Sequence, residues 1–281
     1  MNRFLTQRIG FWLLGLFTLI VVIPILLVIG AIFLKGLAAI NWEFLTAMPR
    51  NGMKAGGIWP AIVGTLILTL GTAIVAIPVG VGGAIYLSEY ARDSWVTRAI
   101  RLAIINLAGI PSVVYGLFGL GMFVLFLRLG TSIVAGSLTL AIMTLPVIIS
   151  ASEEALRAVP VEFRTVNASL GGTRWQGIRQ IVLPQALPGI ITGIMLGLLR
   201  AAGETAPILF TVAAFYLPRL PQSPFDQTMA LPYHLFVIST QVPGMPAEIQ
   251  YGTALVLLTL VLSMNLAATI IRSYFRRRRQ W

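Results

Sequence analysis

Arg200 and Glu204 are the two residues whose types and spacing most clearly suggest chemistry in this chain. They are the only charged residues in an apolar run from about 188 to 212, which is long enough for a helix that crosses a membrane. A separation of four residues places both side chains on one helix face. An arginine offers a fork of donors that fits an oxyanion, and a charge inside a membrane usually faces a polar cavity. We therefore expect a pathway for an anion, in which Arg200 attracts the anion and Glu204 balances the arginine.

The same run leaves two other questions open. The pair could instead be a structural ion pair that holds helices together. Gly189, Gly193 and Gly197 share its helix face, and small residues at every fourth position either allow another helix to approach closely or line a pore. Further polar side chains in neighbouring apolar runs could add donors to a pathway or bond only between helices: Thr65, Asn106, Ser112 and Tyr115.

The composition is that of a membrane protein. Hydrophobic residues make up 57% of the 281 residues and charged residues 10%, whereas a soluble domain carries about 25% charge. The absence of cysteine excludes disulfides and thiolate metal sites, and a single histidine, His234, excludes a multi-histidine metal site. Glu204 is the only acid in the interior of an apolar run, which argues against an intramembrane enzyme. The net charge of +11 does not indicate nucleic acid, because the basic residues lie in the short connections between apolar runs.

Apolar runs define the expected fold, an all-α membrane protein with a single transmembrane domain over 1–281. Six runs are long enough to span a bilayer, near 9–34, 59–88, 102–127, 131–151, 188–212 and 248–271. The first is too long for a signal peptide and lacks its cleavage site. Of the 20 Lys and Arg residues, 14 lie in the connections on one side and 5 on the other, so we expect both termini in the cytoplasm. The basic run 276–279 is expected to contact anionic membrane lipid, with a partner-binding tail as the alternative.

The longest cytoplasmic connection, 152–187, is called the coupling loop below. Its Gly171-Gly172 pair can stop a helix, and Thr173 can cap a further short amphipathic helix that ends before Pro184. Such a helix could lie at the lipid interface or dock a cytoplasmic partner.

Two segments of the coupling loop resemble the EAA loop of ABC-transporter permeases. They are RTVNASLG at 164–171 and IVLP at 181–184, and the spacing from the glycine to the Leu-Pro pair fits that motif. The chain departs from it at Thr165, Val166 and Asn167, where the motif has Glu-Ala-Ala. The resemblance implies that this loop docks on an ATPase subunit through a group of residues: Arg164, Ala168, Gly171, Leu183 and Pro184.

Three more segments narrow the resemblance to the PstA family of permeases from bacterial phosphate-specific ABC transporters. They are GGIWPAI at 56–62, GIPSVVYGLFG at 109–119 and RAAGETAP at 200–207. The resemblance implies a type I ABC importer permease that moves phosphate across the bacterial inner membrane. It implies as partners a second permease similar to PstC, an ATPase dimer similar to PstB, and an external phosphate-binding protein similar to PstS that meets the loop at 213–247.

The chain is not expected to be an enzyme or to bind a cofactor itself. It contains no GxxxxGK[ST] phosphate-binding loop, so ATP and Mg²⁺ are expected on the partner ATPase. The alternative function is a permease for another oxyanion, such as sulfate or molybdate, or for a small solute. A passive channel is disfavoured because a docking loop would have no purpose there.

Overall fold

The computed structural model describes residues 3–169 and 171–277, and most of them form helices. In chain order the first are α1 (Arg3–Gly36), a 3-10 turn η1 (Leu37–Ala39), α2 (Trp42–Thr46), α3 (Trp59–Ile85), α4 (Trp95–Ala108), α5 (Ser112–Gly119) and α6 (Ile133–Arg157). They are followed by α7 (Val161–Ser169), α8 (Arg174–Gly177), α9 (Leu183–Gly203), α10 (Ala206–Thr211), α11 (Leu231–Thr240) and α12 (Ala247–Arg277). The π-helical segments η2 (Tyr86–Tyr90), η3 (Leu120–Phe126) and η4 (Ile178–Val182) extend α3, α5 and α8, and a short hairpin pairs β1 (Pro49–Arg50) with β2 (Ala55–Gly56).

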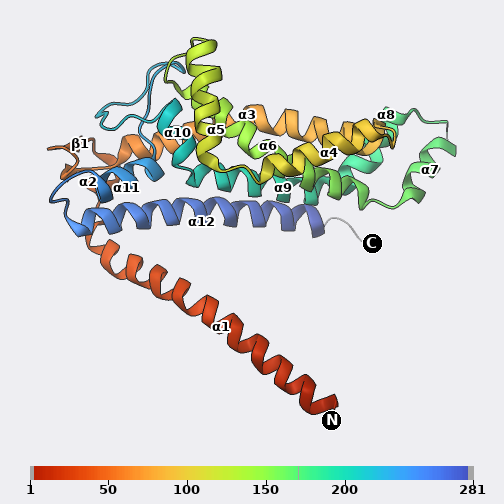
Figure 1. Ribbon diagram of the computed structural model, residues 1–281, viewed down its shortest axis with the longest axis horizontal. Coiled ribbons are helices and arrows are strands. Elements are labelled where there is room, and N and C mark those ends of the chain that lie inside the picture. Colours follow the sequence, from red (N-terminus) through yellow and green to blue (C-terminus); the bar gives the residue numbers. More distant parts are fainter. Residues whose placement is uncertain (1–2, 170, 278–281) are drawn as a thin grey trace.

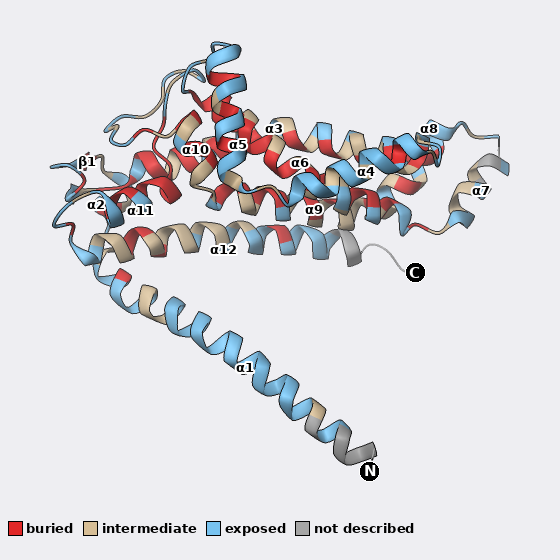
Figure 2. Ribbon diagram, viewed as in Figure 1, coloured by how far each residue is buried: buried red, intermediate tan, exposed pale blue. Residues whose placement is uncertain are grey.

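The long helices α3, α6, α9 and α12 lie side by side and form the body of the molecule (Figure 1). α6 packs against both α3 and α9, and 61% of its most apolar stretch is buried. α1 leaves this body at a steep angle, contacts α12 near Gly36, and buries none of its most apolar stretch (Figure 2). A helix that is apolar all round and uncovered by its own chain is suited to contact lipid or helices of a partner.

The number of spans depends on how α4 and α5 are counted. Among the described residues, five helices are long and apolar enough to cross a membrane, and six if α4 and α5 together form one span. The apolar run at 102–127, predicted as one span, is divided between two helices, because α4 and α5 meet at 102°. Pro111 lies at this bend; it has no N–H, and its ring would clash with the carbonyl of Leu107 in a continuous helix.

The predicted end of a short helix before Pro184 is wrong. α8, η4 and α9 form one helix of 30 residues from Arg174 to Gly203. The N–H of Leu183 bonds to the carbonyl of Ile178, five residues earlier, which widens the helix by one residue immediately before the proline. The wider turn accommodates the proline ring, so the helix passes from the coupling loop into the bundle without a break.

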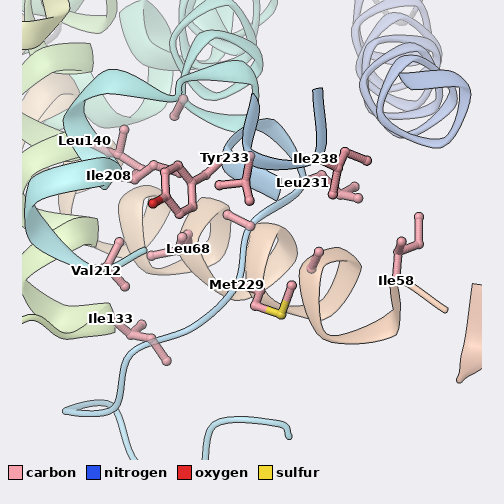
Figure 3. Packing of buried hydrophobic residues seen from close by; sticks show 14 of the residues in the cluster. Ile58, Leu68, Ile133, Leu140, Ile208, Val212, Met229, Leu231, Tyr233 and Ile238 are labelled. Atoms are coloured by element: carbon pink, nitrogen blue, oxygen red, sulfur yellow. The ribbon is translucent and has the colours of Figure 1, made fainter. Parts of the chain in front are cut away.

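The largest group of buried apolar side chains lies where α10 and α11 meet α3 (Figure 3). Leu68 of α3 and Ile208 of α10 pack with Leu231 and Ile238 of α11, which are 0% exposed. α11 belongs to the segment 213–247 that was predicted as an external loop, so part of this loop folds inward and closes one end of the bundle. The basic cluster Arg276–Arg279, for which we predict lipid contact, has side chains outside the described part of the structure.

Candidate functional site

Arg200 and Glu204 lie where α9 ends. Arg200 is in the last turn of the helix, and Glu204 follows the final residue, Gly203, with an extended backbone (φ −77°, ψ 136°). The predicted single helix over 188–212 is therefore wrong, but the two side chains still meet, with Nε of Arg200 3.3 Å from Oε1 of Glu204. The arginine side chain is 36% exposed and the glutamate side chain 17%. Arg200 is thus neutralised on one side and open on another.

Pro207 explains the break between α9 and α10. In a continuous helix its ring would clash with the carbonyl of Gly203, four residues earlier, and it has no N–H to bond there. Glu204 and Thr205 leave the helix, and α10 starts again at Ala206 with Pro207 in its first turn, where proline is tolerated. Broken helices of this kind form substrate sites in several transporter folds. The exposed carbonyls at the end of α9 also stabilise the arginine cation in the last turn.

The middle of α5 lies beside the start of α10. A Cβ atom on Gly116 would be only 3.0 Å from the carbonyl oxygen of Ala206 and 3.0 Å from Cα of Pro207, so α5 packs closely on α10. Tyr115 is buried, donates its hydroxyl to the carbonyl of Leu107 at 2.7 Å, and lies close enough to Arg200 to interact with its charge. The structure therefore brings Tyr115 to the predicted pair.

Ser112 and Thr65, the other predicted pathway residues, differ in what their hydroxyls do. Ser112 is half-buried in the first turn of α5, and its hydroxyl makes no hydrogen bond within the described residues. Thr65 of α3 is buried; its hydroxyl donates to the carbonyl of Ala61 at 2.8 Å and accepts from the N–H of Leu231 at 2.8 Å. This geometry favours the interpretation of Thr65 as a bond between helices. Asn106 lies exposed on α4.

The glycine row of α9 faces α6. A Cβ atom added at each position would come within 3 Å of a side chain of α6, and the pairs are Gly189 with Ala155 (2.5 Å), Gly193 with Ala151 (2.6 Å) and Gly197 with Ile148 (2.9 Å). Of the two interpretations left open by the sequence, this geometry favours helix packing over pore lining.

The motif residues of the coupling loop lie in α7, in the turn that follows it, at the end of η4 and in the first turn of α9. Gly171 has φ +73°, a left-handed conformation that favours glycine. The predicted cap at Thr173 is confirmed: its hydroxyl accepts from the N–H of Gln176, and the Gln176 side chain accepts from the N–H of Thr173. Leu183 is half-buried and Pro184 exposed at the start of α9. Ala168 belongs to α7, and its side chain is outside the described part.

Asn167 has a structural role that sequence analysis missed. Its Nδ2 donates to the carbonyls of Gly172 (3.4 Å) and Thr173 (3.1 Å), which ties α7 to the start of α8. A Cβ on Gly177 would lie 2.7 Å from the same nitrogen, so the amide fills the space between the two helices. The sequence did hold one indication of this role, since Asn167 stands where the EAA motif has alanine.

Glu89 and Glu153 are buried acids at this end of the bundle that were also missed. The Glu89 side chain is 7% exposed and lies 2.8 Å from Nη2 of Arg164. The Glu153 side chain is 11% exposed, accepts a hydrogen bond from Nε of Arg101 at 2.8 Å and forms an ion pair with Arg157 at 2.9 Å. The available signal was their position: each is an acid at the end of an apolar run, where a buried charge requires a partner. No group of three or more His, Asp or Glu side chains that could hold a metal ion occurs among the described residues.

Comparison with known proteins gives consistent matches. Residues 76–281 match the family model described as binding-protein-dependent transport system inner membrane component. A probable ABC transporter permease, YqgI of Bacillus subtilis, is 34% identical over 95% of both chains. The phosphate transport system permease PstA 1 of Mycobacterium tuberculosis is 34% identical, covering 93% of this chain and 85% of that protein. A probable PstA of Methanocaldococcus jannaschii is 32% identical over 93% and 92%.

Solved structures of ABC importers share the fold. The transporter that imports the acidic polysaccharide alginate gives a TM-score of 0.69 at 15% identity, over 97% of this chain and 99% of the matched chain. The methionine transporter MetNI, in an inward-facing conformation, gives 0.60 at 18% identity, over 78% and 94%.

Proposed function

Because the chain belongs to the family of binding-protein-dependent transport system inner membrane components, we propose that it is the permease subunit that carries inorganic phosphate across the membrane. The family consists of multi-span membrane subunits of ABC importers, which are not themselves catalytic. Phosphate is supported by relatives named as phosphate permeases that align over more than nine tenths of this chain. The observation that carries the proposal is the half-exposed Arg200 at the end of the broken helix α9, 3.3 Å from Glu204.

Arg200 and Glu204 act as a competing pair in this proposal. In the empty pathway the Glu204 carboxylate occupies one edge of the guanidinium and offsets the cost of a charge within the membrane. A phosphate ion approaches the open edge and takes two parallel N–H···O bonds, which suit its tetrahedral oxygens. Glu204 repels the bound anion, so phosphate leaves once the site opens to the other side. Ser112 lies at the start of the neighbouring helix α5 and can add a hydroxyl donor, whereas Tyr115, whose hydroxyl already donates to the carbonyl of Leu107, shapes the pathway beside it.

The remaining subunits follow from the same proposal. A second permease similar to PstC covers the exposed side of Arg200 and completes the pathway. An ATPase dimer similar to PstB, which carries ATP and Mg²⁺, docks on the coupling loop around Ala168, Gly171, Leu183 and Pro184. A phosphate-binding protein similar to PstS meets the loop at 213–247 from outside, and both termini of the chain lie in the cytoplasm.

The proposal is tested by phosphate uptake in cells that lack other phosphate transporters, with the membrane level of each variant measured. Arg200→Gln should abolish uptake, because it leaves Glu204 as an uncompensated negative charge facing an anion. Arg200→Lys should keep part of the activity, since a point charge replaces a fork of donors. Glu204→Gln should slow release more than binding. Arg98→Gln, which removes an arginine that is 69% exposed, is the matched control and should transport normally.

Two outcomes would overturn the proposal. If Arg200→Gln inserts fully and transports phosphate normally, the ion pair is structural and the pathway lies elsewhere. If the parent transporter takes up sulfate or molybdate and not phosphate, the substrate assignment is wrong while the site is retained.

A further inference from the structure

The five residues of η2, which end α3 (Trp59–Ile85), are held by arginines from several helices. Arg101 of α4 donates Nη2 to the carbonyl of Leu87 at 2.9 Å. The guanidinium of Arg174, the first residue of α8, lies 5.3 Å from the centre of the Tyr90 ring, within the range of a cation–π contact. The end of α3 is therefore joined both to α4 and to the coupling loop.

Arg164 of α7 makes the most extensive of these contacts. It meets Glu89 with two hydrogen bonds, Nε to Oε2 at 3.2 Å and Nη2 to Oε1 at 2.8 Å. Its remaining donors reach the end of α6, with Nη1 2.6 Å from the carbonyl oxygen of Val159 and Nη2 2.9 Å from that of Leu156. One guanidinium thus binds α7 to α3 and α6 together.

Burial makes this contact difficult to open. The Glu89 side chain is 7% exposed and that of Arg164 27%. If α7 moved away on its own, the carboxylate of Glu89 would lose both hydrogen bonds from Arg164 and would keep, among the described residues, only the hydroxyl of Ser88 as a partner. Removing one member of a largely buried ion pair is strongly unfavourable. Separation from η2 is therefore costly, and the coupling loop moves most easily as one body with the end of α3.

We propose that Arg164 is a positioning residue that, through Glu89, transfers displacement of the coupling loop to α3. α3 packs on α6, α9 and α11, and its Thr65 bonds the first residue of α11 at the opposite end of the bundle. Movement of the loop therefore reaches the helices that surround the anion site. This inference rests on the proposed function, since it gives the coupling loop its task in transport. It also gives Arg164 a role inside this chain rather than on the ATPase surface.

The test uses the complete transporter in proteoliposomes, with this chain, the second permease, the ATPase and the phosphate-binding protein. The measured quantity is phosphate imported per ATP hydrolysed, because a purely structural defect lowers both rates together and leaves their ratio unchanged. Glu89→Gln and Arg164→Gln should each lower the ratio by roughly tenfold. The double variant should be no worse than either single variant, since both remove the same contact. Arg164→Lys, which keeps a positive charge beside Glu89 and loses the fork, should fall between.

An exposed ion pair in the adjoining connection supplies the control. Asp93 and Arg98 lie 3.2 Å apart with side chains 76% and 69% exposed, so Asp93→Asn and Arg98→Gln should leave the ratio unchanged. A normal ratio in assembled Arg164→Gln or Arg164→Lys would overturn the inference, as would additive losses in the double variant. A parent transporter that imports no phosphate would instead contradict the proposed function, so the two failures are distinguishable.

Discussion

Replacing Gly193 by alanine tests whether the glycine row of α9 (Leu183–Gly203) is a packing surface. The new Cβ would lie 2.6 Å from Cβ of Ala151 on α6. That is about 1 Å closer than the 3.5–4.0 Å at which two carbon atoms attract best. Both atoms are attached directly to helix backbones, so neither can rotate away. Relief of the clash requires α9 and α6 to separate along their contact.

The magnitude follows from two opposing contributions. Overpacking a close contact costs about 1–3 kcal/mol, while exchanging glycine for alanine inside a helix gains about 1 kcal/mol. The net expectation for Gly193→Ala is a loss of roughly 0–2 kcal/mol. Gly82→Ala in α3 (Trp59–Ile85) is the matched control, because nothing lies within 4 Å of its added Cβ and only the gain applies. The two variants should therefore differ by about 1–3 kcal/mol.

The assay is thermal unfolding of the purified transporter in detergent, followed by the amount of intact complex that remains. Gly193→Ala should unfold at a lower temperature than the parent or at the same temperature, and Gly82→Ala at a higher one. If both variants gain stability equally, α6 is not in contact with this row in the membrane. The row would then face open space, and the pore interpretation would replace packing.

Two further predictions concern polar side chains in the buried end of the bundle. Thr65→Val should lose about 1–3 kcal/mol of stability, because the N–H of Leu231 loses its acceptor; Thr65→Ser keeps the hydroxyl and should match the parent in thermal unfolding, and equal melting of both variants would contradict the bond. Burial lowers the pKa of His234 to about 4, from an ordinary value of 6.5, so the folded protein takes up this proton at lower pH than the unfolded chain. Stability should be full above pH 6.5 and fall by about 2 kcal/mol between pH 7 and pH 5; His234→Phe should remove this part of the pH dependence, and an unchanged profile would refute it.

The fold was predictable from sequence as far as apolar length and Lys/Arg placement determine it. The positions of α1, α3, α6 and α12 follow from runs of apolar residues, and the cap at Thr173 from its residue type. The predictions of where helices continue or end differ from the structure at three prolines. Pro111 and Pro207 interrupt a helix, whereas Pro184 is accommodated within a helix by the π-helical turn before it. A one-residue widening of the backbone depends on tertiary packing, and no local pattern in the sequence indicates it.

The candidate site was predictable in its central pair but not in its surroundings. Arg200 and Glu204 stand out because charge is rare in apolar runs, and they meet as the spacing predicted even though the helix ends between them. Glu89 and Arg164 lie 75 residues apart, and nothing in the local sequence pairs them. The inward fold of α11 (Leu231–Thr240) was hidden for a related reason, because its ten residues are too few to give a clear apolar run.

The unbroken helix from Arg174 to Gly203 has a geometrical consequence for the ion pair at its far end. Arg174 and Arg200 are separated by about 39 Å along the helix axis. The close contact of Gly189 with Ala155 of α6 lies between them and can serve as a pivot for the helix. A rotation of about 5° around that pivot moves Arg174 by about 2 Å and Arg200 by about 1.5 Å in the opposite direction. Glu204 follows Gly203 directly and its N–H bonds to the carbonyl of Ala201, so the glutamate moves with the end of the helix. A tilt of α9 would therefore shift the ion pair as a unit relative to α10, which starts as a separate helix at Ala206, and would leave the 3.3 Å contact of Arg200 with Glu204 in place.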